Sequence, residues 1–476
     1  MNMKSTTTTP LMSRIGTRLV AAVAVLAVIA GCAVGPEYKR PDVEVPMAFK
    51  ETGDWKIAEP RDGVQRGQWW EIFGDGALQA IEEQVDISNQ NIRAAEAQFR
   101  AAQAVVRAAR AAGFPAVSGR AGASRSGQGS GANSLFTAGV DAGWEIDLWG
   151  RVRRTVEAGE ANMQASAADL ESLRLSTQGT LAQNYFQLRV ADAQRQLLDE
   201  TVAGYERSLL LVNNQYNAGL VARGDVIQAE TQLKSAQAQV IDAGIQRAQF
   251  EHAIALLIGK PASSFSIPQA AIARTVPRIP PGVPSRLLER RPDIAAVERR
   301  MTAANAQIGV AEAAMYPTLT LSASAGLQSS TLADLFSLPS RVWSIGPALA
   351  ASLFDAGLRR AQTDQAIASY DASVANYRQT VLTAFQEVED NLVAQRLLEQ
   401  ESVVQDAAVA AADQSVEIAL NQYRAGTVSY LSVVTAQTIA YTNRRSALDI
   451  LRQRLVAAAG LVKALGGGWT GVLPWP

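Results

Sequence analysis

The chain has few of the residues from which metal sites, disulfides and catalytic centres are built. Its 476 residues include one cysteine and one histidine. One cysteine cannot form an internal disulfide, and zinc or copper sites need several thiolate or imidazole ligands together. No nucleophile with a His/Asp partner set can be assembled either, so an enzyme is not expected. His252 lies in an Ala-rich stretch, where we expect an ordinary surface or packing residue.

An excess of positive charge is also lacking. The formal net charge is -1 at pH 7, and charged residues make up 19% of the chain. Binding to nucleic acid depends on a basic surface that displaces counterions from the phosphates. Nucleic acid is therefore not expected as a partner.

Only one continuous hydrophobic run stands out, and it lies near the N-terminus. Residues 19–30 form a run of twelve apolar residues, too short to span a bilayer as a helix. Basic residues precede this run, namely Lys4, Arg14 and Arg18. The pattern predicts a secretory signal peptide over residues 1–31.

The signal ends in a segment, Ile29-Ala30-Gly31-Cys32, that resembles a bacterial lipoprotein cleavage site. That resemblance implies that Cys32 receives a diacylglycerol on its sulfur and becomes the first residue of the mature chain. Ala33, rather than Asp, follows the cysteine. By resemblance to the sorting signals of bacterial lipoproteins, this residue favours the outer membrane. The alternative is a buried cysteine after an ordinary signal. Residues 32–67 are rich in proline and predict an extended, lipid-anchored tether.

Four segments alternate apolar with small polar residues at the period of two that is typical of β-strands. They cover residues 117–125, 136–148, 316–330 and 343–353. Each is about ten residues long, which suits a strand that spans a bilayer. The pattern predicts two hairpins, at about 116–149 and 318–354, and the first has a Gly/Ser/Asn-rich segment, 126–134, expected to be its loop.

A sheet inside a membrane must close on itself, because an open edge leaves backbone N–H and C=O groups unpaired in hydrocarbon. Four strands cannot close, since the smallest single-chain barrels have about eight. Three copies would supply roughly twelve strands, so a trimer is the simplest solution. The alternative that the strand pattern leaves open is a soluble β-sandwich with one face exposed to solvent.

Two helical patterns are much longer than a globular core requires. They cover about residues 153–214 and 358–423, and roughly sixty residues make a rod of order 90 Å. Each has a coiled-coil-like seam of apolar residues at steps of three and four. Both patterns break at an Ala-Gly pair, and shorter helices are expected elsewhere, at about 75–112, 225–259 and 292–314.

The same plan of helix, hairpin, long helix, break and helix occurs twice. Phe114-Pro115 corresponds to Tyr316-Pro317, and residues 214–219 correspond to 421–426. The sequence therefore predicts an internal duplication. Its parts are a first repeat at 68–260, a Pro-rich linker at 261–285, a second repeat at 286–468 and a tail at 469–476. The expected fold class is mainly α, with long coiled-coil helices that form a tube and four strands per chain in a shared trimeric barrel, which together form a conduit.

Several motifs resemble the TolC-like outer membrane factors, and within them the NodT-type efflux lipoproteins. They follow one another in order along nearly the whole mature chain: Cys32–Pro41 (CAVGPEYKRP), Trp69-Trp70 with Phe73-Gly74-Asp75, Trp144–Arg151 (WEIDLWGR), Arg290–Ile294 (RRPDI), Gln307-Ile308-Gly309 before Tyr316-Pro317, and Ala464–Trp469 (ALGGGW).

The resemblance implies a homotrimer with an outer membrane barrel of roughly twelve strands continuous with a periplasmic α-barrel. Such channels receive drugs or other small toxic compounds from a periplasmic adaptor (membrane fusion) protein and an inner membrane transporter of the resistance-nodulation-division (RND) class. The chain is then anchored in outer membrane lipid by Cys32 and needs no cofactor besides that lipid. Two alternatives remain open: an exit duct for heavy-metal efflux or type I secretion, and a non-conducting structural lipoprotein that spans the periplasm.

The resemblance also implies a periplasmic gate at the two helix breaks, where an Asp bonds across to a Tyr and an Arg. The Asp position falls on Asp225 and the Tyr position on Tyr423, and Tyr216 is the equivalent of Tyr423 at the first break. An alternative for Asp225 is that it caps the helix that follows.

The chain departs from the family pattern near this gate. The family Arg position falls on Val428, and two acids that face the lumen in some members fall on Ser432 and Thr435. Arg223 and Arg424 lie close by and are expected to take over part of the lock. Without the acids, the channel is expected to be less cation-selective and less sensitive to block by multivalent cations.

Overall fold

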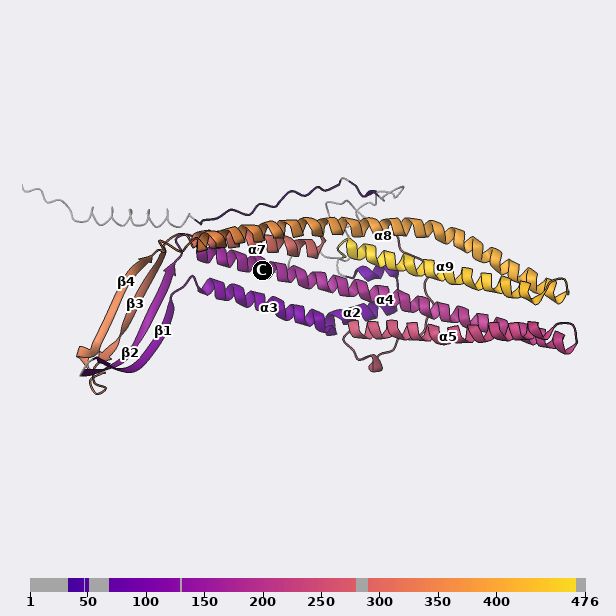
Figure 1. Ribbon diagram of the computed structural model, residues 1–476, viewed down its shortest axis with the longest axis horizontal. Coiled ribbons are helices and arrows are strands. Elements are labelled where there is room, and N and C mark those ends of the chain that lie inside the picture. The colour runs from indigo at the N-terminus through magenta and orange to yellow at the C-terminus, as the bar shows by residue number, and fades with distance from the viewer. Residues whose placement is uncertain (1–32, 47, 51–67, 129–130, 280–289, 468–476) are drawn as a thin grey trace, which may run out of the picture. The chain divides into compact units, whose positions relative to one another are not determined.

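The computed structural model describes residues 33–46, 48–50, 68–128, 131–279 and 290–467 (Figure 1). The expected signal peptide, Cys32, part of the tether and the tail from residue 469 lie outside the described residues. The chain divides into two compact units. Unit 1 comprises Met1–Asp42, Gln98–Ser166 and Ala296–Tyr377, and unit 2 comprises Val43–Ala97, Ala167–Ala295 and Arg378–Pro476.

Unit 1 contains a four-stranded antiparallel sheet with the strand order β1-β2-β3-β4 (Figure 1). Its strands are β1 (Ala116–Gln128), β2 (Gly131–Ile146), β3 (Thr318–Ser329) and β4 (Arg341–Ala350). The central pair, β2 and β3, comes from different halves of the chain and joins the two repeats. Within the described residues, β1 and β4 each have one edge without a partner strand.

The strand register places the apolar residues of neighbouring strands on one face of the sheet. Val140 of β2 lies opposite Ala325 of β3, which lies opposite Trp343 of β4. On the other face, Ser324 lies opposite Ser344, and their hydroxyl oxygens are 2.8 Å apart. The predicted sheet with one apolar and one polar face is therefore confirmed.

The first hairpin differs from the prediction at its tip. The expected loop at 126–134 is mostly strand, because Ser126 pairs with Asn133 in the continuing ladder. Ladder hydrogen bonds use the backbone, so cross-strand pairing outweighs the low strand propensity of Gly and Asn. At their other ends, β2 stops at Ile146 and β4 at Ala350, slightly before the predicted limits.

The helices confirm the internal duplication through equal lengths. Each pair of equivalent helices has the same number of residues: 22 in α3 (Gln90–Ala111) and α7 (Pro292–Ala313), 67 in α4 (Arg151–Asn217) and α8 (Leu358–Arg424), and 35 in α5 (Arg223–Leu257) and α9 (Tyr430–Ala464). A helix of this greatest length extends about 100 Å. No helix in the described part of the chain is both long and apolar enough to cross a membrane.

The helix predicted over 75–112 is divided in two at Asn89, so that prediction is wrong. α2 (Gly76–Ser88) is capped by Asp75, whose carboxylate accepts two backbone N–H groups. Asn89 Oδ1 accepts two N–H groups from the start of α3, and its Nδ2 donates to the Leu257 carbonyl at 2.6 Å. The break is thus stabilised by the end of α5, a partner far away in sequence.

A similar joint occurs in the second repeat, where the motif Arg290–Ile294 meets the end of α9. Arg291 donates from Nη1 to the Ala464 carbonyl at 3.1 Å and binds both carboxylate oxygens of Asp293 at 3.0 and 2.7 Å. Its guanidinium also lies 2.6 Å from Glu387 of α8. The motif therefore holds the end of α9 against the start of α7.

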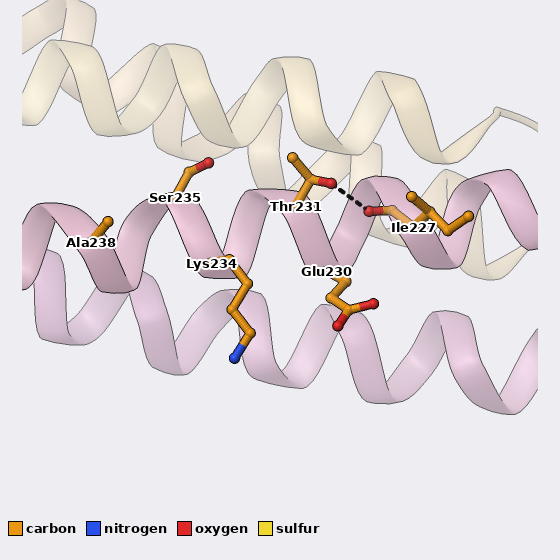
Figure 2. Close-up of a pocket in the computed structure, with 6 residues that line it drawn as sticks. All are labelled: Ile227, Glu230, Thr231, Lys234, Ser235 and Ala238. Atoms are coloured by element: carbon orange, nitrogen blue, oxygen red, sulfur yellow. Dashed lines mark hydrogen bonds between the residues drawn. The ribbon is translucent and has the colours of Figure 1, made fainter.

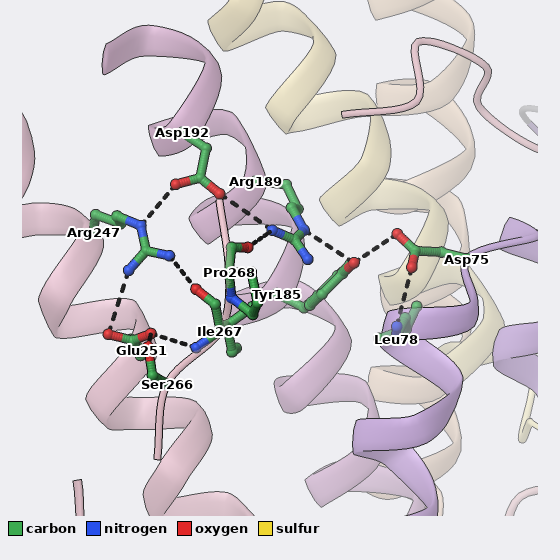
Figure 3. A network of polar contacts seen from close by, with 10 residues as sticks. All are labelled: Asp75, Leu78, Tyr185, Arg189, Asp192, Arg247, Glu251, Ser266, Ile267 and Pro268. Carbon is green, nitrogen blue, oxygen red and sulfur yellow. Dashed lines mark hydrogen bonds and ion pairs between the residues drawn. The ribbon is translucent and has the colours of Figure 1, made fainter. Parts of the chain in front are cut away.

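A network of largely buried polar contacts crosses unit 2 (Figure 3). The Tyr185 hydroxyl of α4 donates to Asp75 at 2.7 Å and accepts from Arg189 Nε at 3.0 Å. Asp192 bridges Arg189 and Arg247 of α5, at 3.2 and 2.7 Å. Both arginines also donate to carbonyl groups of the connector after α5. The network thus attaches the connector to α4 and α5.

The apolar core of unit 2 includes Trp69 and Trp70 of the short helix η2 (Trp69–Phe73), with side chains from α2, α4, α5, α8 and α9. Glu82 of α2 is fully buried, and neither of its carboxylate oxygens has a hydrogen-bond partner among the described residues. Burial, and to a smaller extent the charge of Asp86, raise the pKa of Glu82 to about 9. Glu82 is therefore protonated at neutral pH.

Candidate functional site at the helix turns

Two helix pairs in the chain end in the same turn: coil 1 (α4 and α5) and coil 2 (α8 and α9). Gly219 in coil 1 and Gly426 in coil 2 both have φ of +73°. In coil 1, the Leu220 N–H donates to the Gln215 carbonyl and the Gly219 N–H to that of Tyr216, and coil 2 repeats both bonds. This is the Schellman motif, in which a left-handed glycine ends the helix. Both predicted breaks are therefore confirmed.

Apolar residues next to the turns join coil 1 to coil 2. We call this group the tip cluster, and its buried members come from all four helices: Val212, Ala229, Ala419, Tyr423, Tyr430, Val433 and Ala436. The rings of Tyr423 and Tyr430 are 5.5 Å apart at their centroids, with their planes inclined by 58°. Tilted ring pairs of this kind add about 0.5–1.5 kcal/mol to the burial of their area.

Tyr423 and Asp225, the predicted lock residues, lie near one another without a hydrogen bond between them. Tyr423 is buried, and its hydroxyl has no hydrogen-bond partner among the described residues. Burial raises the pKa of Tyr423, and the negative charge of Asp225 raises it further. An unused phenol donor is thus held beside a half-buried carboxylate, and the predicted hydrogen bond between them stays a prediction.

Asp225 is the third residue of α5 and not its N-cap. The N-cap is Ala222, which provides no side-chain hydrogen bond. The alternative in which Asp225 itself caps the helix is therefore wrong, because α5 starts two residues earlier than predicted. In the first turn its carboxylate still meets the positive end of the helix dipole, which stabilises a negative charge by about 0.3–1 kcal/mol.

Tyr430 belongs to the site but was not predicted from the sequence. It is almost completely buried, and burial together with the neighbouring Tyr423 and Tyr205 raises its pKa to about 12. The available signal was its position, since Tyr423 and Tyr430 flank the same turn. Alternation patterns do not report such a pair, because the two residues belong to different helices.

Uncharged hydrogen bonds join coil 1 to α9 beside the tip cluster. Three bonds of 3.0–3.1 Å form this polar seam: Gln437 Nε2 to Ser208 Oγ, Gln232 Nε2 to Thr438 Oγ1, and Tyr441 Oη to Gln239 Oε1. Each neutral hydrogen bond contributes about 0.5–1.5 kcal/mol. Polar contact between the coils at this level is therefore made by neutral hydrogen bonds.

Three other predicted site residues are exposed and do not enter the tip cluster. Tyr216 is 42% exposed, and Ser432 and Thr435 are exposed on α9. The Thr435 hydroxyl donates to a backbone carbonyl of its own helix at 2.9 Å. Cys32, the predicted lipidation site, lies outside the described residues.

The arginines expected to support the lock are also exposed. Arg223 begins α5, and Arg424 at the end of α8 donates to Asn421 Oδ1 at 3.3 Å. Among the described residues, neither guanidinium forms an ion pair with Asp225. Val428, on which the resemblance places the family Arg position, is half-buried and packs against the tip cluster. The side chain at this position therefore makes an apolar contact.

An open hollow of ≈ 490 Å³ runs along one face of α5 (Figure 2). Its lining residues follow one another at steps of three and four, which places them in a single stripe: Ile227, Glu230, Thr231, Lys234, Ser235 and Ala238. A stripe from one helix has no opposing wall to enclose a small molecule, but it can pack against another helix. Within the described residues, no group of three or more His, Cys, Asp or Glu side chains is placed to hold a metal ion.

Comparison with known proteins matches the chain to one family over most of its length. The model of the outer membrane efflux protein family matches residues 83–260 and 283–467. The chain is 30% identical over 447 residues to the cation efflux system protein CusC of Escherichia coli, covering 92% of this chain and 97% of CusC. It is 31% identical over 456 residues to TtgC, a probable efflux pump outer membrane protein of Pseudomonas putida, covering 93% and 94%.

The fold agrees with a solved channel. The structure of the outer-membrane channel OprN matches with a TM-score of 0.86 at 30% identity, covering 92% of this chain and 100% of that one. The family resemblance and the fold class predicted from the sequence are both confirmed. The chain therefore belongs to the outer membrane efflux protein family, a family of outer membrane channels.

Proposed function

We propose that three copies of this chain form the outer membrane channel of a tripartite efflux pump. The channel would receive drugs or other small toxic compounds from an RND-type transporter in the inner membrane, through a periplasmic adaptor protein, and release them outside the cell. The chain would carry out no reaction on this cargo. It would need no cofactor besides a lipid on Cys32, which would anchor it in the outer membrane.

The observation that carries this proposal is a four-stranded sheet with one apolar face, one polar face and an unpaired edge on each side. In hydrocarbon, the free edges of β1 and β4 would leave backbone groups unpaired at several kcal/mol each. Pairing β4 of one copy with β1 of the next satisfies both edges. Three copies then close a barrel of roughly twelve strands with its polar face inside.

The helices support the same assembly. The stripe on α5 is an uncovered face that a neighbouring helix can pack against. α4 and α8 each leave the sheet and continue for 67 residues, about 100 Å at the helical rise. Copies joined through their strands would therefore bring long helices side by side around one axis, and these would form a tube that continues the barrel.

The turns of coil 1 and coil 2 would form the closed periplasmic end. The carboxylate of Asp225 would accept from the hydroxyl of Tyr423, a charged hydrogen bond of about 1.5–3 kcal/mol. Three such bonds could hold a pore shut and still be released when an adaptor binds. The tip cluster and the polar seam would hold each coil pair in the same closed arrangement.

The native mass of the detergent-extracted mature protein tests the assembly. We expect three chains, and insertion of this species into a planar bilayer should give discrete conductance steps. A stable monomer that conducts nothing would contradict the barrel and would favour the alternative of a structural lipoprotein. The mass of the N-terminal peptide in the same sample tests the lipid on Cys32 separately.

A second candidate cargo is a metal cation, because CusC, a relative at 30% identity, belongs to a cation efflux system. The sensitivity of a strain that lacks the gene to toxic compounds distinguishes the two candidate cargoes. Increased sensitivity to organic solvents and antibiotics alone favours the drug-type pump, whereas increased sensitivity to heavy-metal salts alone favours cation efflux. Complementation by the intact gene is the control.

A further inference from the structure

The charged residues of the sheet fall into two groups, one on each face. Those on the polar face are paired. Arg120 of β1 lies 3.1 Å from Asp141 of β2, and Glu145 of β2 lies 2.6 Å from Arg151 at the start of α4. The charges on the polar face therefore cancel in pairs.

The apolar face carries basic charge alone. Arg125 of β1 lies opposite Ser134, on the same face as Val117. Arg341 of β4 lies opposite Leu327, on the same face as Trp343. Both arginine side chains are exposed, and within the described residues neither guanidinium forms an ion pair. Each arginine thus presents free hydrogen-bond donors on the face that would meet lipid.

The two arginines lie equally far along their strands from the helices (Figure 1). Arg125 is eight residues from Val117 on β1, and Arg341 is eight residues from Leu349 on β4. Eight residues extend about 27 Å along a strand, which is about 20 Å in height at a tilt of roughly 40°. The apolar band of an outer membrane barrel is about 25 Å tall. Both arginines therefore lie at the end of this band that is away from the helices.

Aromatic residues on the same face support this placement. Trp343 is 78% exposed and lies two residues from Arg341 on β4. Phe136 of β2 lies on this face too, opposite Ser329 of β3. Aromatic girdles mark the interfaces of membrane barrels, and the cost of an outward charge falls steeply from the midplane to the interface. The arginines are thus positioned at the level of the lipid head groups.

The proposed trimer brings the two arginines onto neighbouring strands. β1 and β4 are the outer strands of the sheet, so β4 of one copy pairs with β1 of the next. Pairing keeps each face of a sheet continuous, and neighbouring strands lie about 4.8 Å apart. Arg341 of one copy and Arg125 of the next therefore face outward on adjacent strands.

Few acids lie nearby to neutralise these arginines. Residues 119–140, which include Arg125 and the hairpin tip, contain no Asp or Glu. The loop between β3 and β4 contains Asp334, whose carboxylate accepts from Thr331 Oγ1 at 2.5 Å. Guanidinium groups bind phosphate with two parallel hydrogen bonds, so a pair of them suits a phosphate group. The chemistry of this surface therefore complements an anionic lipid head group.

We propose that Arg341 of one copy and Arg125 of the next bind the phosphate of a lipid head group, in the leaflet at the end of the barrel away from the helices. The acyl chains of this lipid lie along the apolar face beside Trp343. The inference rests on the proposed trimeric barrel. One such site at each junction ties neighbouring copies together, so lipid binding stabilises the trimer.

Native mass spectrometry of the detergent-solubilised trimer tests the site. The probe is diphosphoryl lipid A, and its dephosphorylated form, which has the same acyl chains, is the comparison. We expect wild type to bind the phosphorylated form about tenfold more tightly. Arg125→Gln and Arg341→Gln should each lower this affinity by about tenfold, because each removes a charged donor. Arg120→Gln is the matched control, since it removes the same charge from β1 on the opposite face.

A second measurement tests whether the site is shared between copies. Diphosphoryl lipid A should raise the temperature at which the wild-type trimer dissociates into monomers, because a ligand that bridges two copies stabilises their association. The double variant Arg125→Gln/Arg341→Gln should show no such increase. An equal increase in wild type and in the double variant overturns the shared site.

The outcomes separate this inference from the proposed function. Equal affinity for the two forms of the lipid overturns the site, as does an unchanged affinity in either arginine variant or an equal loss in Arg120→Gln. A trimer in the same spectrum shows that the variant has folded and assembled, and it leaves the barrel standing. A wild-type monomer contradicts the trimer itself, and with it both the proposed function and this site.

Discussion

At the residue scale, the buried phenol of Tyr423 beside Asp225 gives the clearest functional test. Asp225→Ala removes the acceptor of the proposed lock, and a bond of about 1.5–3 kcal/mol corresponds to at least tenfold in open population. We expect a higher single-channel conductance in planar bilayers. Asp242→Ala, an exposed acid further along α5, is the control. Unchanged conductance would remove Asp225 from the gate.

Glu82 predicts how the stability of the protein depends on pH. Its pKa is about 9 in the folded protein, raised by burial and then by Asp86, against 4.5 for the ordinary side chain. Between these values the folded protein holds a proton that the unfolded chain releases. The contribution of Glu82 is thus fully present below pH 4.5 and is lost as pH rises towards 9, by up to about 1.4 kcal/mol per pH unit.

The variant Glu82→Gln keeps the shape of the side chain and removes its titration. Thermal unfolding followed between pH 5 and 9 should show a smaller decrease in stability for this variant than for wild type. Glu83→Gln, at the exposed neighbouring position, should follow the wild-type curve. If Glu82→Gln and wild type decline in parallel, Glu82 is not the group that titrates.

At the scale of elements, the Schellman turns predict opposite effects for two nearby glycines. Gly219 has φ of +73°, so Gly219→Ala should destabilise the turn by about 1–2 kcal/mol. Gly224 lies in the first turn of α5, where a Cβ meets nothing within 4 Å. Gly224→Ala should therefore stabilise by about 0.5–1 kcal/mol. Denaturant unfolding of both variants measures the difference, and equal effects would contradict the assigned turn.

The two faces of the sheet predict different tolerance to charge. Ala323 and Ser322 are neighbours near the middle of β3 and point to the apolar and polar faces. Ala323→Lys should lower the yield of inserted protein, because a lysine in the lipid costs about 2–4 kcal/mol at the membrane midplane. Ser322→Lys should insert normally. The membrane fraction after carbonate extraction gives the yield, and a reversed order would mean that the faces are exchanged.

Alternation in the sequence was sufficient to identify four strands and their faces, because β-strands have a period of two that needs no knowledge of their partners. The hairpin tip around Ser126 was predicted to be a loop, since its Gly and Ser residues carry no such period. Pairing with Asn133 decided its structure. Strand ends therefore depended on tertiary contacts, while strand identity did not.

The helix breaks show the same division between local and distant causes. Gly219 and Gly426 were predicted as breaks, because a glycine that ends a helix is a local signal. The break at Asn89 was missed, because it depends on the Leu257 carbonyl. In the candidate site, Asp225 and Tyr423 were found by family resemblance, whereas Tyr430 becomes evident only when coil 1 and coil 2 are seen together.

At the scale of the whole molecule, the polar residues at the channel ends predict weak ion selectivity. Ser432 and Thr435, which the family resemblance predicts to face the lumen, are neutral, and on the sheet Arg120 pairs with Asp141 at 3.1 Å. We expect a reversal potential close to zero under a salt gradient and little block by multivalent cations. Thr435→Asp should increase cation selectivity. An unchanged reversal potential in this variant would place Thr435 outside the conduction path.

The equal lengths of corresponding helices restrict how such a chain can be lengthened or shortened. One residue added to α4 would advance its end by about 1.5 Å and rotate it by about 100°, which would turn the tip cluster away from coil 2. Seven residues make nearly two full turns and preserve the seam. A viable variant that reaches a different distance should therefore gain or lose residues in sevens, in all four helices α4, α5, α8 and α9 together.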